Sequence, residues 1–408
     1  MTESGRKRAD HTVKKARFEK SFPKRESAQE KSAPSMKGKE KAKDMDDTSE
    51  PPPHLASTFK IVAGSYEKLL YGLEGTVSPS ESGYEFHLEP IFIFPAHVSC
   101  IKAVAASPGG KWLATGSADE IVKVWDLARR KEIGGLMHHQ GSITYLQFPS
   151  RSHLLSASED GTLCLFHARD WAVLRIFKGH KGRVNSVAVH PSGKVALSVG
   201  QDRTLRMWDM MRGKGSASTK LGKEGEVVRW SLKGSFFIVQ CHSSLEIFST
   251  DMVLRHTLSH ASRIHSVRFC KRVNGAGELM LVAAEDKKVS VYQVPEDPEE
   301  TPSIIAEMVG HSNRVKAVEI LEIAVPPRTN STSTTIVCTV SSDGKIFVYD
   351  LAGLPADAKD RVQLQPVSEY DTKGTRLTCV TISEGRADSS EAGQKRKRGE
   401  ENDEETQH

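Results

Sequence analysis

The chain has 408 residues, and its formal net charge is +5, from 57 Lys and Arg against 52 Asp and Glu. This balance is too even to indicate a nucleic-acid or membrane partner by itself. Because no run of about 18 apolar residues occurs, no membrane-spanning helix is expected. The first residues also lack the apolar core of a secretory signal.

The six cysteines do not form metal-binding pairs, since no two of them are closer than 29 residues. Most fall in expected strands, so we expect buried free thiols. No metal and no cofactor is expected. The cysteines are Cys100, Cys164, Cys241, Cys270, Cys338 and Cys379.

Residues 1–56 form a polar, basic tract with 14 Lys and Arg against 10 Asp and Glu. The tract offers too little apolar surface to offset the conformational entropy lost on folding, so we expect a disordered N-terminal tail. Its basic clusters suit nuclear import, nucleic-acid binding or simply solubility.

A repeated pattern begins near residue 57. Residues 59–73 align without a gap against residues 111–125, which have the character of the second and third strands of a four-stranded unit. No first strand precedes residue 59, so that strand has to come from elsewhere in the chain. The best-preserved copy, residues 179–209, begins with Gly-His and ends with Trp-Asp.

This period, about 40 residues, is typical of a WD40 propeller blade. Seven first strands and seven second-plus-third-strand units match only if residues 377–383 complete the sheet that begins at residue 59. We therefore predict an all-β fold, a seven-bladed WD40 propeller over residues 57–384 that is closed by N- and C-terminal strands. The repeats are counted by the position four residues before the leading aliphatic residue of each first strand. It holds His97, His139, His180, Lys223, His260, His311 and Lys373.

Four repeats carry His, Ser or Thr, and Asp in a fixed order, two of them with Trp, and this order resembles catalytic triads. Several copies of one constellation favour a structural role, because an enzyme needs one site. In blade geometry the side chains would meet inside the sheet, satisfy buried polar groups and hold the turn. No catalytic residue is expected. The predicted structural tetrads are His97, Thr115, Asp119 and Trp125; His139, Ser156 and Asp160; His180, Ser198, Asp202 and Trp208; and His311, Thr339 and Asp343.

Two repeats have lost much of this set. The repeat at 223–248 has Lys223 in place of His, no Asp in its turn and Phe248 in place of Trp. The repeat that begins at His260 keeps Asp286 but lacks the hydroxyl and the Trp.

One face of the expected propeller is basic. The turns before each first strand and those between second and third strands share a face, and the residue just before the first strand is Arg in four of seven repeats. Guanidinium groups on a ring suit phosphate or an acidic segment, although solvated surface charge is the plainer interpretation. The candidate binding residues are Arg183, Arg203, Arg263, Arg314 and Arg376, and the equivalent positions elsewhere are assigned to Cys100, Ser142 and Glu226.

The opposite face is expected to carry almost every long insertion, which suggests a second surface for a protein partner. The expected insertions are residues 74–83, 210–218, 271–278, 295–303, 324–335 and 352–365.

Residues 385–408 form a second polar tail, which we expect to be disordered. Its four-residue basic cluster is a candidate nuclear-import signal, and an acidic segment, residues 400–405, follows. The candidate import residues are Lys395, Arg396, Lys397 and Arg398.

The chain resembles the PAK-interacting-protein family of WD40 proteins, which includes the fungal maintenance-of-killer protein. The resemblance rests on residues 59–73, 94–102, 114–120, 141–144 and 154–161, together with the weak repeat at 223–248. It covers roughly residues 57–384, and the tails match only in being basic. It implies a nucleolar factor in maturation of the large ribosomal subunit, and for animal members a negative regulator of a p21-activated-type kinase.

Two functions follow as hypotheses. The first is a non-enzymatic scaffold for large (60S) ribosomal subunit biogenesis in the nucleus and nucleolus, which binds preribosomal assembly proteins, with rRNA as a further candidate contact. The alternative is a signalling adaptor that binds and inhibits a PAK-type kinase. Either is expected to be monomeric, with no membrane and no small-molecule substrate. An enzyme would need a unique acid, base or metal cluster, and fold alone does not decide between these classes.

Overall fold

The computed structural model describes residues 55–81, 83–297, 299–326, 332–356 and 361–385. The N-terminal tail up to residue 54 and the C-terminal tail from residue 386 lie outside the described residues, and so does the candidate import cluster at 395–398. In the part of the chain that is described, no helix is long and apolar enough to cross a membrane.

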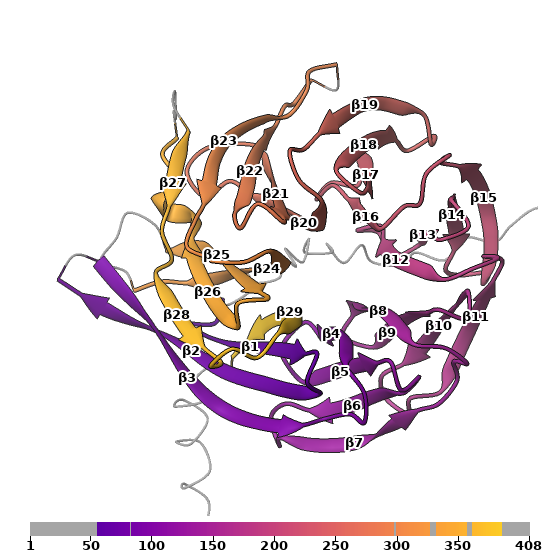
Figure 1. The fold of residues 1–408 in the computed structure, drawn as a ribbon, viewed down its shortest axis with the longest axis horizontal. Helices are drawn as coiled ribbons and strands as arrows, with labels where there is room; N and C mark the ends of the chain where they lie inside the picture. The colour runs from indigo at the N-terminus through magenta and orange to yellow at the C-terminus, as the bar shows by residue number, and fades with distance from the viewer. Residues whose placement is uncertain (1–54, 82, 298, 327–331, 357–360, 386–408) are drawn as a thin grey trace, which may run out of the picture. The chain divides into compact units, whose positions relative to one another are not determined.

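Seven β-sheets surround a common centre, as Figure 1 shows. Four of them follow one another along the chain, and each begins with its innermost strand. We number the sheets as blades. Blade 2 contains β4 (Ile101–Ala106), β5 (Trp112–Ser117), β6 (Val122–Asp126) and β7 (Lys131–Leu136); blade 3 contains β8 (Ile143–Ser150), β9 (His153–Ser158), β10 (Thr162–His167) and β11 (Val173–Lys178). Blade 4 contains β12 (Val184–Val189), β13 (Val195–Gly200), β14 (Thr204–Asp209) and β15 (Lys214–Lys220); blade 5 contains β16 (Val227–Trp230), β17 (Phe236–Cys241), β18 (Ser244–Ser249) and β19 (Leu254–Ser259).

Blade 1 joins the two ends of the propeller, as predicted. Its strand order is β29 (Leu377–Glu384), β1 (Thr58–Ser65), β2 (Leu69–Ser80) and β3 (Gly83–Pro95). β29 pairs antiparallel with β1, from Phe59 opposite Glu384 to Ser65 opposite Leu377. This pairing covers the inner edge of β1 and joins the two ends of the propeller, which closes the ring of blades.

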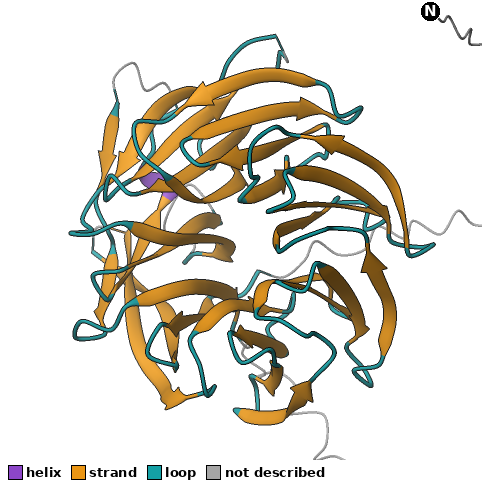
Figure 2. Ribbon diagram, turned by 45° about the vertical axis from the view of Figure 1, so that its right-hand side comes forward, coloured by secondary structure: helices purple, strands orange, loops and turns teal. Residues whose placement is uncertain are grey.

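Blade 6 gains a fifth strand from the chain segment that follows the third strand of blade 7. Blade 6 contains β20 (Ile264–Lys271), β21 (Glu278–Ala284), β22 (Val289–Val294) and β23 (Ser303–Met308); blade 7 contains β24 (Val315–Ala324), β25 (Ser333–Ser341), β26 (Lys345–Asp350) and β28 (Ser368–Asp371). After β26 the chain forms a short 3-10 helix, η1 (Leu351–Gly353), and then adds β27 (Val362–Leu364) in parallel to β23 of blade 6. The expected insertion at 352–365 therefore supplies a fifth strand to the neighbouring blade. Figure 2 shows how little of the described chain is helical.

The core lies between the blades. Each of the seven interfaces between neighbouring blades holds one cluster of buried hydrophobic side chains. The cluster between blades 7 and 1 packs Phe59 and Ile61 against Ile336 and Val348. Inner strands such as β13 are almost continuously buried, whereas the outermost strand β15 is mostly exposed. All six cysteines are free thiols, and five are buried.

Two expectations about chain register were wrong. Most of residues 74–83 is strand rather than loop, since β2 and β3 continue through it as one long hairpin, and Tyr84 on this hairpin donates a hydrogen bond to Asp350 of blade 7. In blade 5, Val227 pairs with Gln240 as Ser186 pairs with Val199 in blade 4, so Val227 is the equivalent of Ser186 and not of Val184. Glu224 rather than Glu226 is therefore the equivalent of Arg183.

Candidate functional site: the basic rim of the propeller

The face that carries the arginines is defined by backbone hydrogen bonds. The residue after a second strand donates its N–H to the carbonyl just before the first strand of the same blade, as from Gln201 to Arg183 (2.8 Å) and from Ser342 to Arg314 (3.2 Å). The same bond joins Tyr66 to Arg376 at 2.9 Å. We call the face formed by these turns the top face. The arginines before the first strands and the turns of the tetrads both lie on it.

The tetrad of blade 4 forms a continuous hydrogen-bonded chain. Trp208 Nε1 donates to Ser198 Oγ at 2.8 Å, Ser198 Oγ lies 2.7 Å from His180 Nε2, and His180 Nδ1 lies 3.0 Å from Asp202. Because the Asp202 carboxylate can only accept, Nδ1 carries the ring proton, and the unprotonated Nε2 accepts from the Ser198 hydroxyl. Burial lowers the pKa of His180 despite the attraction of Asp202, which keeps the ring neutral.

The Asp of each tetrad also holds its turn. Asp202 accepts the backbone N–H of Lys181 at 3.0 Å and that of Thr204 at 3.1 Å. In blade 7, burial opposes ionisation of Asp343, but bonds from His311 and from the backbone N–H groups of Lys345 and Ser312 outweigh it, and the pKa falls well below its usual range. The network thus fixes the turns of the top face. We call the candidate arginines on these turns the rim arginines; they are Arg183, Arg203, Arg263, Arg314 and Arg376.

The other tetrads vary around this arrangement. His97 lies 2.8 Å from Thr115 and 3.0 Å from Asp119, and Trp125 donates to Thr115 at 3.0 Å. His139 lies 2.7 Å from Ser156 and 3.0 Å from Asp160, and His311 lies 2.8 Å from Thr339 and 3.1 Å from Asp343. In blade 7 the hydroxyl of Tyr349, at the Trp position, donates instead to the Val309 carbonyl. In blade 6 the set is loose, with His260 3.8 Å from Asp286.

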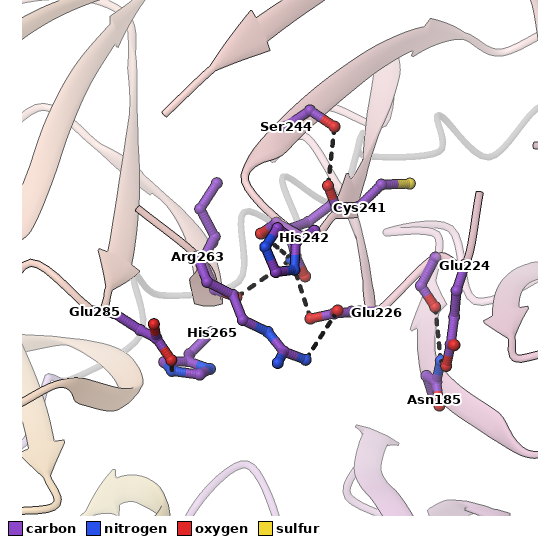
Figure 3. A network of polar contacts seen from close by, with 12 residues as sticks. Asn185, Glu224, Glu226, Cys241, His242, Ser244, Arg263, His265 and Glu285 are labelled. Atoms are coloured by element: carbon purple, nitrogen blue, oxygen red, sulfur yellow. Dashed lines mark hydrogen bonds and ion pairs between the residues drawn. The ribbon is translucent and has the colours of Figure 1, made fainter. Parts of the chain in front are cut away.

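Three rim arginines are paired with glutamates that sequence reasoning did not connect to them. Arg183 donates to Glu224 at 3.0 Å. Arg263 donates to Glu226 at 3.0 Å, as Figure 3 shows. The carboxylate of Glu285 lies 3.9 Å from Arg314. Each pair links the top turns of neighbouring blades, so the rim is an alternating ring of charges rather than a purely basic one. Glu224 and Glu226 precede the first strand of the blade next to their arginines, and this position was the available signal, whereas Glu285 lies in the turn after β21.

The other two candidate arginines lie apart from these pairs. Arg376 covers the ring of Tyr66 at 5.2 Å, and its backbone N–H donates to Glu67. Arg203 occupies the turn after β13 with a φ of 58° and an exposed side chain. Because both guanidinium groups lack a carboxylate partner among the described residues, they keep their positive charge available to a ligand.

The mouth of the central channel adds a cationic group that was not predicted. Lys316, on β24, lies 3.5 Å from His265 of blade 6, whose ring lies 3.3 Å from Glu285. Burial, then the charge of Arg314, lowers the pKa of Lys316 to about 8. Burial, then Lys316, lowers the pKa of His265 to about 4. Positive charge therefore gathers around this mouth beyond what Glu285 balances.

The top face is equipped for binding by charge. Its exposed ion pairs can be exchanged for pairs with a partner at small cost, since surface pairs contribute about 1 kcal/mol or less. Among the described residues, no group of three His, Cys, Asp or Glu side chains is placed to hold a metal ion. Each His–Asp pair is hydrogen-bonded within its own blade, and the pairs do not converge on one open position.

Comparison with known proteins agrees with this geometry. The family model for the WD domain, G-beta repeat, matches residues 88–126, 130–167 and 171–209, which contain the tetrads of blades 2, 3 and 4. Such repeats form protein-interaction domains. The chain is 33% identical over 329 residues to the p21-activated protein kinase-interacting protein 1-like of Danio rerio, covering 80% of this chain and 81% of that protein.

Two fungal proteins are similar over the same span. Protein MAK11 of Saccharomyces cerevisiae is 32% identical over 369 residues, which cover 79% of this chain and 83% of that one. The Shk1 kinase-binding protein 15 of Schizosaccharomyces pombe is 26% identical over 329 residues, with 79% and 83% covered. The chain belongs to the family of WD40-repeat proteins that contains PAK-interacting protein 1 and MAK11.

Proposed function

We propose that this protein is a non-enzymatic scaffold for assembly of the large ribosomal subunit, which works in the nucleolus and binds preribosomal proteins through its top face. The observation that carries the proposal is the similarity to MAK11 over 79% of this chain and 83% of that protein, because resemblance to that family implies this role. The charged rim supports it, because a ring of arginines can engage acidic protein segments or rRNA phosphates. The basic cluster at 395–398 would bring the protein into the nucleus.

The test is a triple substitution of rim arginines, Arg183→Ala, Arg263→Ala and Arg314→Ala. Removing them leaves Glu224, Glu226 and Glu285 uncompensated, so the rim becomes acidic. The tagged variant should lose most of its co-sedimentation with preribosomal particles. Affinity purification with and without nuclease would then show whether the contact runs through protein or rRNA.

A matched control lies on the opposite face. Arg129, Arg169 and Arg212 are exposed in the turns after the third strands of blades 2, 3 and 4. Their joint replacement by alanine removes the same charge and should leave co-sedimentation intact. Unchanged co-sedimentation of the rim variant, or an equal loss in both triple variants, would contradict the proposed binding face.

A second candidate function is that of an adaptor that binds and restrains a p21-activated-type kinase. Two relatives favour it, because the proteins from Danio rerio and Schizosaccharomyces pombe are named as kinase-interacting or kinase-binding proteins. Deletion of residues 395–398 separates the two candidates. Under the scaffold function the deletion should exclude the protein from the nucleus and abolish preribosome association. Under the adaptor function, kinase binding and location should both persist.

A further inference from the structure

The seven innermost strands enclose a central channel with a cavity of about 550 Å³. Strand pairing places one residue from each blade at the same level of the channel wall, opposite the second-strand residue that precedes the Ser or Thr position of the tetrads. Only three of these residues are ionisable. The middle ring consists of Ala105, Gln147, Ala188, Arg229, Arg268, Glu319 and Thr381, all of which line the cavity.

The ring contains one more positive charge than negative charge. Arg268 forms a two-pronged ion pair with Glu319, one arm of which joins Nε to Oε2 at 2.9 Å. In the part of the chain that the structure describes, Arg229 forms no ion pair with a carboxylate. Its Nη1 donates to the Val228 carbonyl at 2.6 Å and to Ser186 Oγ at 3.0 Å, and its guanidinium lies 4.9 Å from the centre of the Tyr145 ring.

The Arg229 guanidinium is incompletely satisfied. Its Nε is buried and has no hydrogen-bond partner among the described residues, and the same holds for the Thr144 hydroxyl higher on the channel wall. Burial, then the charge of Arg268, lowers the pKa of Arg229 to about 10, so the group still carries its charge at neutral pH. Arg229 as a whole is partly exposed and lines the cavity, so an anion that enters the channel can reach its guanidinium and supply the hydrogen bonds that it lacks.

The chemistry of the missing anion follows from the charges. A single carboxylate balances the one excess charge of the middle ring. A phosphate group carries about −1.5 to −2 at neutral pH and would face the Glu319 carboxylate at the same level. The carboxylate also suits the planar guanidinium, which can bind both of its oxygens.

The approach to this ring is from the rim. Glu226, His265 and Lys316 line the cavity and also take part in the rim contacts, so the channel continues the top face. The cationic mouth around Lys316 attracts acidic segments before they enter. One side chain of a peptide that lies across the rim can therefore extend into the channel toward Arg229.

We propose that the central channel binds the side-chain carboxylate of an acidic peptide segment from a partner protein, with Arg229 as its ligand in the middle ring and Lys316 at the entrance. This deepens the scaffold function by naming the chemistry of a partner. It does not rest on whether that partner belongs to the ribosome or to a kinase.

The test uses the full chain and a fluorescein-labelled deca-glutamate peptide, with binding followed by fluorescence anisotropy at low ionic strength. Arg229→Gln should weaken binding at least tenfold, and Lys316→Gln should weaken it several-fold. The control Arg212→Gln removes an exposed arginine of the opposite face and should bind within twofold of wild type. Arg229→Gln should also keep or raise the melting temperature of the unliganded protein, because it removes an unpaired buried charge.

Several results would overturn the proposal. Wild type could bind deca-glutamate no better than a Gly-Ser peptide of equal length, or Arg229→Gln and Lys316→Gln could both bind like wild type. Inorganic phosphate could displace the peptide more effectively than acetate at equal ionic strength, which would assign the site to phosphate. Arg229-dependent binding of oligouridylate in place of the peptide would assign it to RNA. Loss of preribosome association in the rim triple variant is a separate measurement, so either idea can fail alone.

Discussion

Blades 4 and 5 are neighbours of the same size, but they are stabilised by different interactions. Blade 4 contains the hydrogen-bonded chain from Trp208 to Asp202. Blade 5 has Val239 at the serine position and fills the space with aromatic rings, where Phe237 stacks on Phe248 with centres 5.4 Å apart. The shape of a blade therefore depends on filling the space between sheets, and the polar tetrad is one of two ways to do so.

The turn of blade 5 shows the same exchange. It is tighter than the turn of blade 4, with His242 at a φ of 58°. No Asp holds it. The amide of Gln240 instead donates to the His242 carbonyl at 2.8 Å and to the Ile264 carbonyl of blade 6 at 3.2 Å. Side chain–backbone bonds thus replace the side chain–side chain network of blade 4.

The largest expected effect is in the aromatic blade. Phe248→Ala removes a ring that is 4% exposed and opens a cavity beside Phe237, so we expect a loss of about 3–5 kcal/mol in the free energy of unfolding. Urea denaturation measures it. The control Leu254→Ala, on the exposed outer strand of the same blade, should change stability by about 0.5 kcal/mol or less. A loss no larger than that of the control would show that blade 5 does not depend on its rings.

Asp202→Ala is expected to have a smaller effect, because it removes acceptors without opening a large cavity. His180, Lys181 and Thr204 would lose their partner, and we expect a loss of about 1–3 kcal/mol. The control is Asp170→Ala, since Asp170 also lies 3.0 Å from a histidine, His167, but is solvent-exposed. Thermal melts should separate the two variants, and equal melting temperatures would contradict a structural role for the tetrad.

The sequence predicted those features that depend on spacing. The blade count and the pairing of residues 377–383 beside residue 59 followed from a pattern of about 40 residues, because each blade needs the same four strands to cover its neighbours. Features that depend on contacts between repeats were not predictable in this way. β27 pairs in parallel with β23 of the neighbouring blade, and the long β2–β3 hairpin contacts Asp350 of blade 7 through Tyr84.

The binding residues divide in the same manner. The arginines at a fixed position in each repeat could be found, but Glu224, Glu226 and Glu285 were not recognised as their partners, because these pairs join side chains of neighbouring blades. In blade 5 the expected alignment was also wrong by two residues, since Val227 is the equivalent of Ser186 and not of Val184. Arg229 was not recognised either. It occupies a position that holds alanine in blades 2 and 4, so only the closed channel shows that its charge faces an enclosed space.

The smallest expected effect concerns pH, and it follows from the neutral histidine of blade 4. Burial lowers the pKa of His180 below the value of about 6.5 that the unfolded chain has, so the unfolded state binds the extra proton first. The stabilisation is therefore complete above about pH 7.5 and declines as the pH falls through 6.5 toward the pKa of the folded state. For this one group the loss between pH 7.5 and 6 should be below about 1 kcal/mol.

The measurement is the free energy of unfolding in urea at a series of pH values for wild type and His180→Asn. The variant should be less stable at pH 7.5 but should depend less steeply on pH between 7.5 and 6. Blade 5 supplies the control, because its tetrad histidine is absent and Phe248→Leu should lower stability without changing the slope. If His180→Asn and Phe248→Leu both gave the wild-type slope of unfolding free energy against pH, the neutral His180 would not account for the difference between the blades. In that case the tetrad would stabilise blade 4 by packing, as the rings stabilise blade 5.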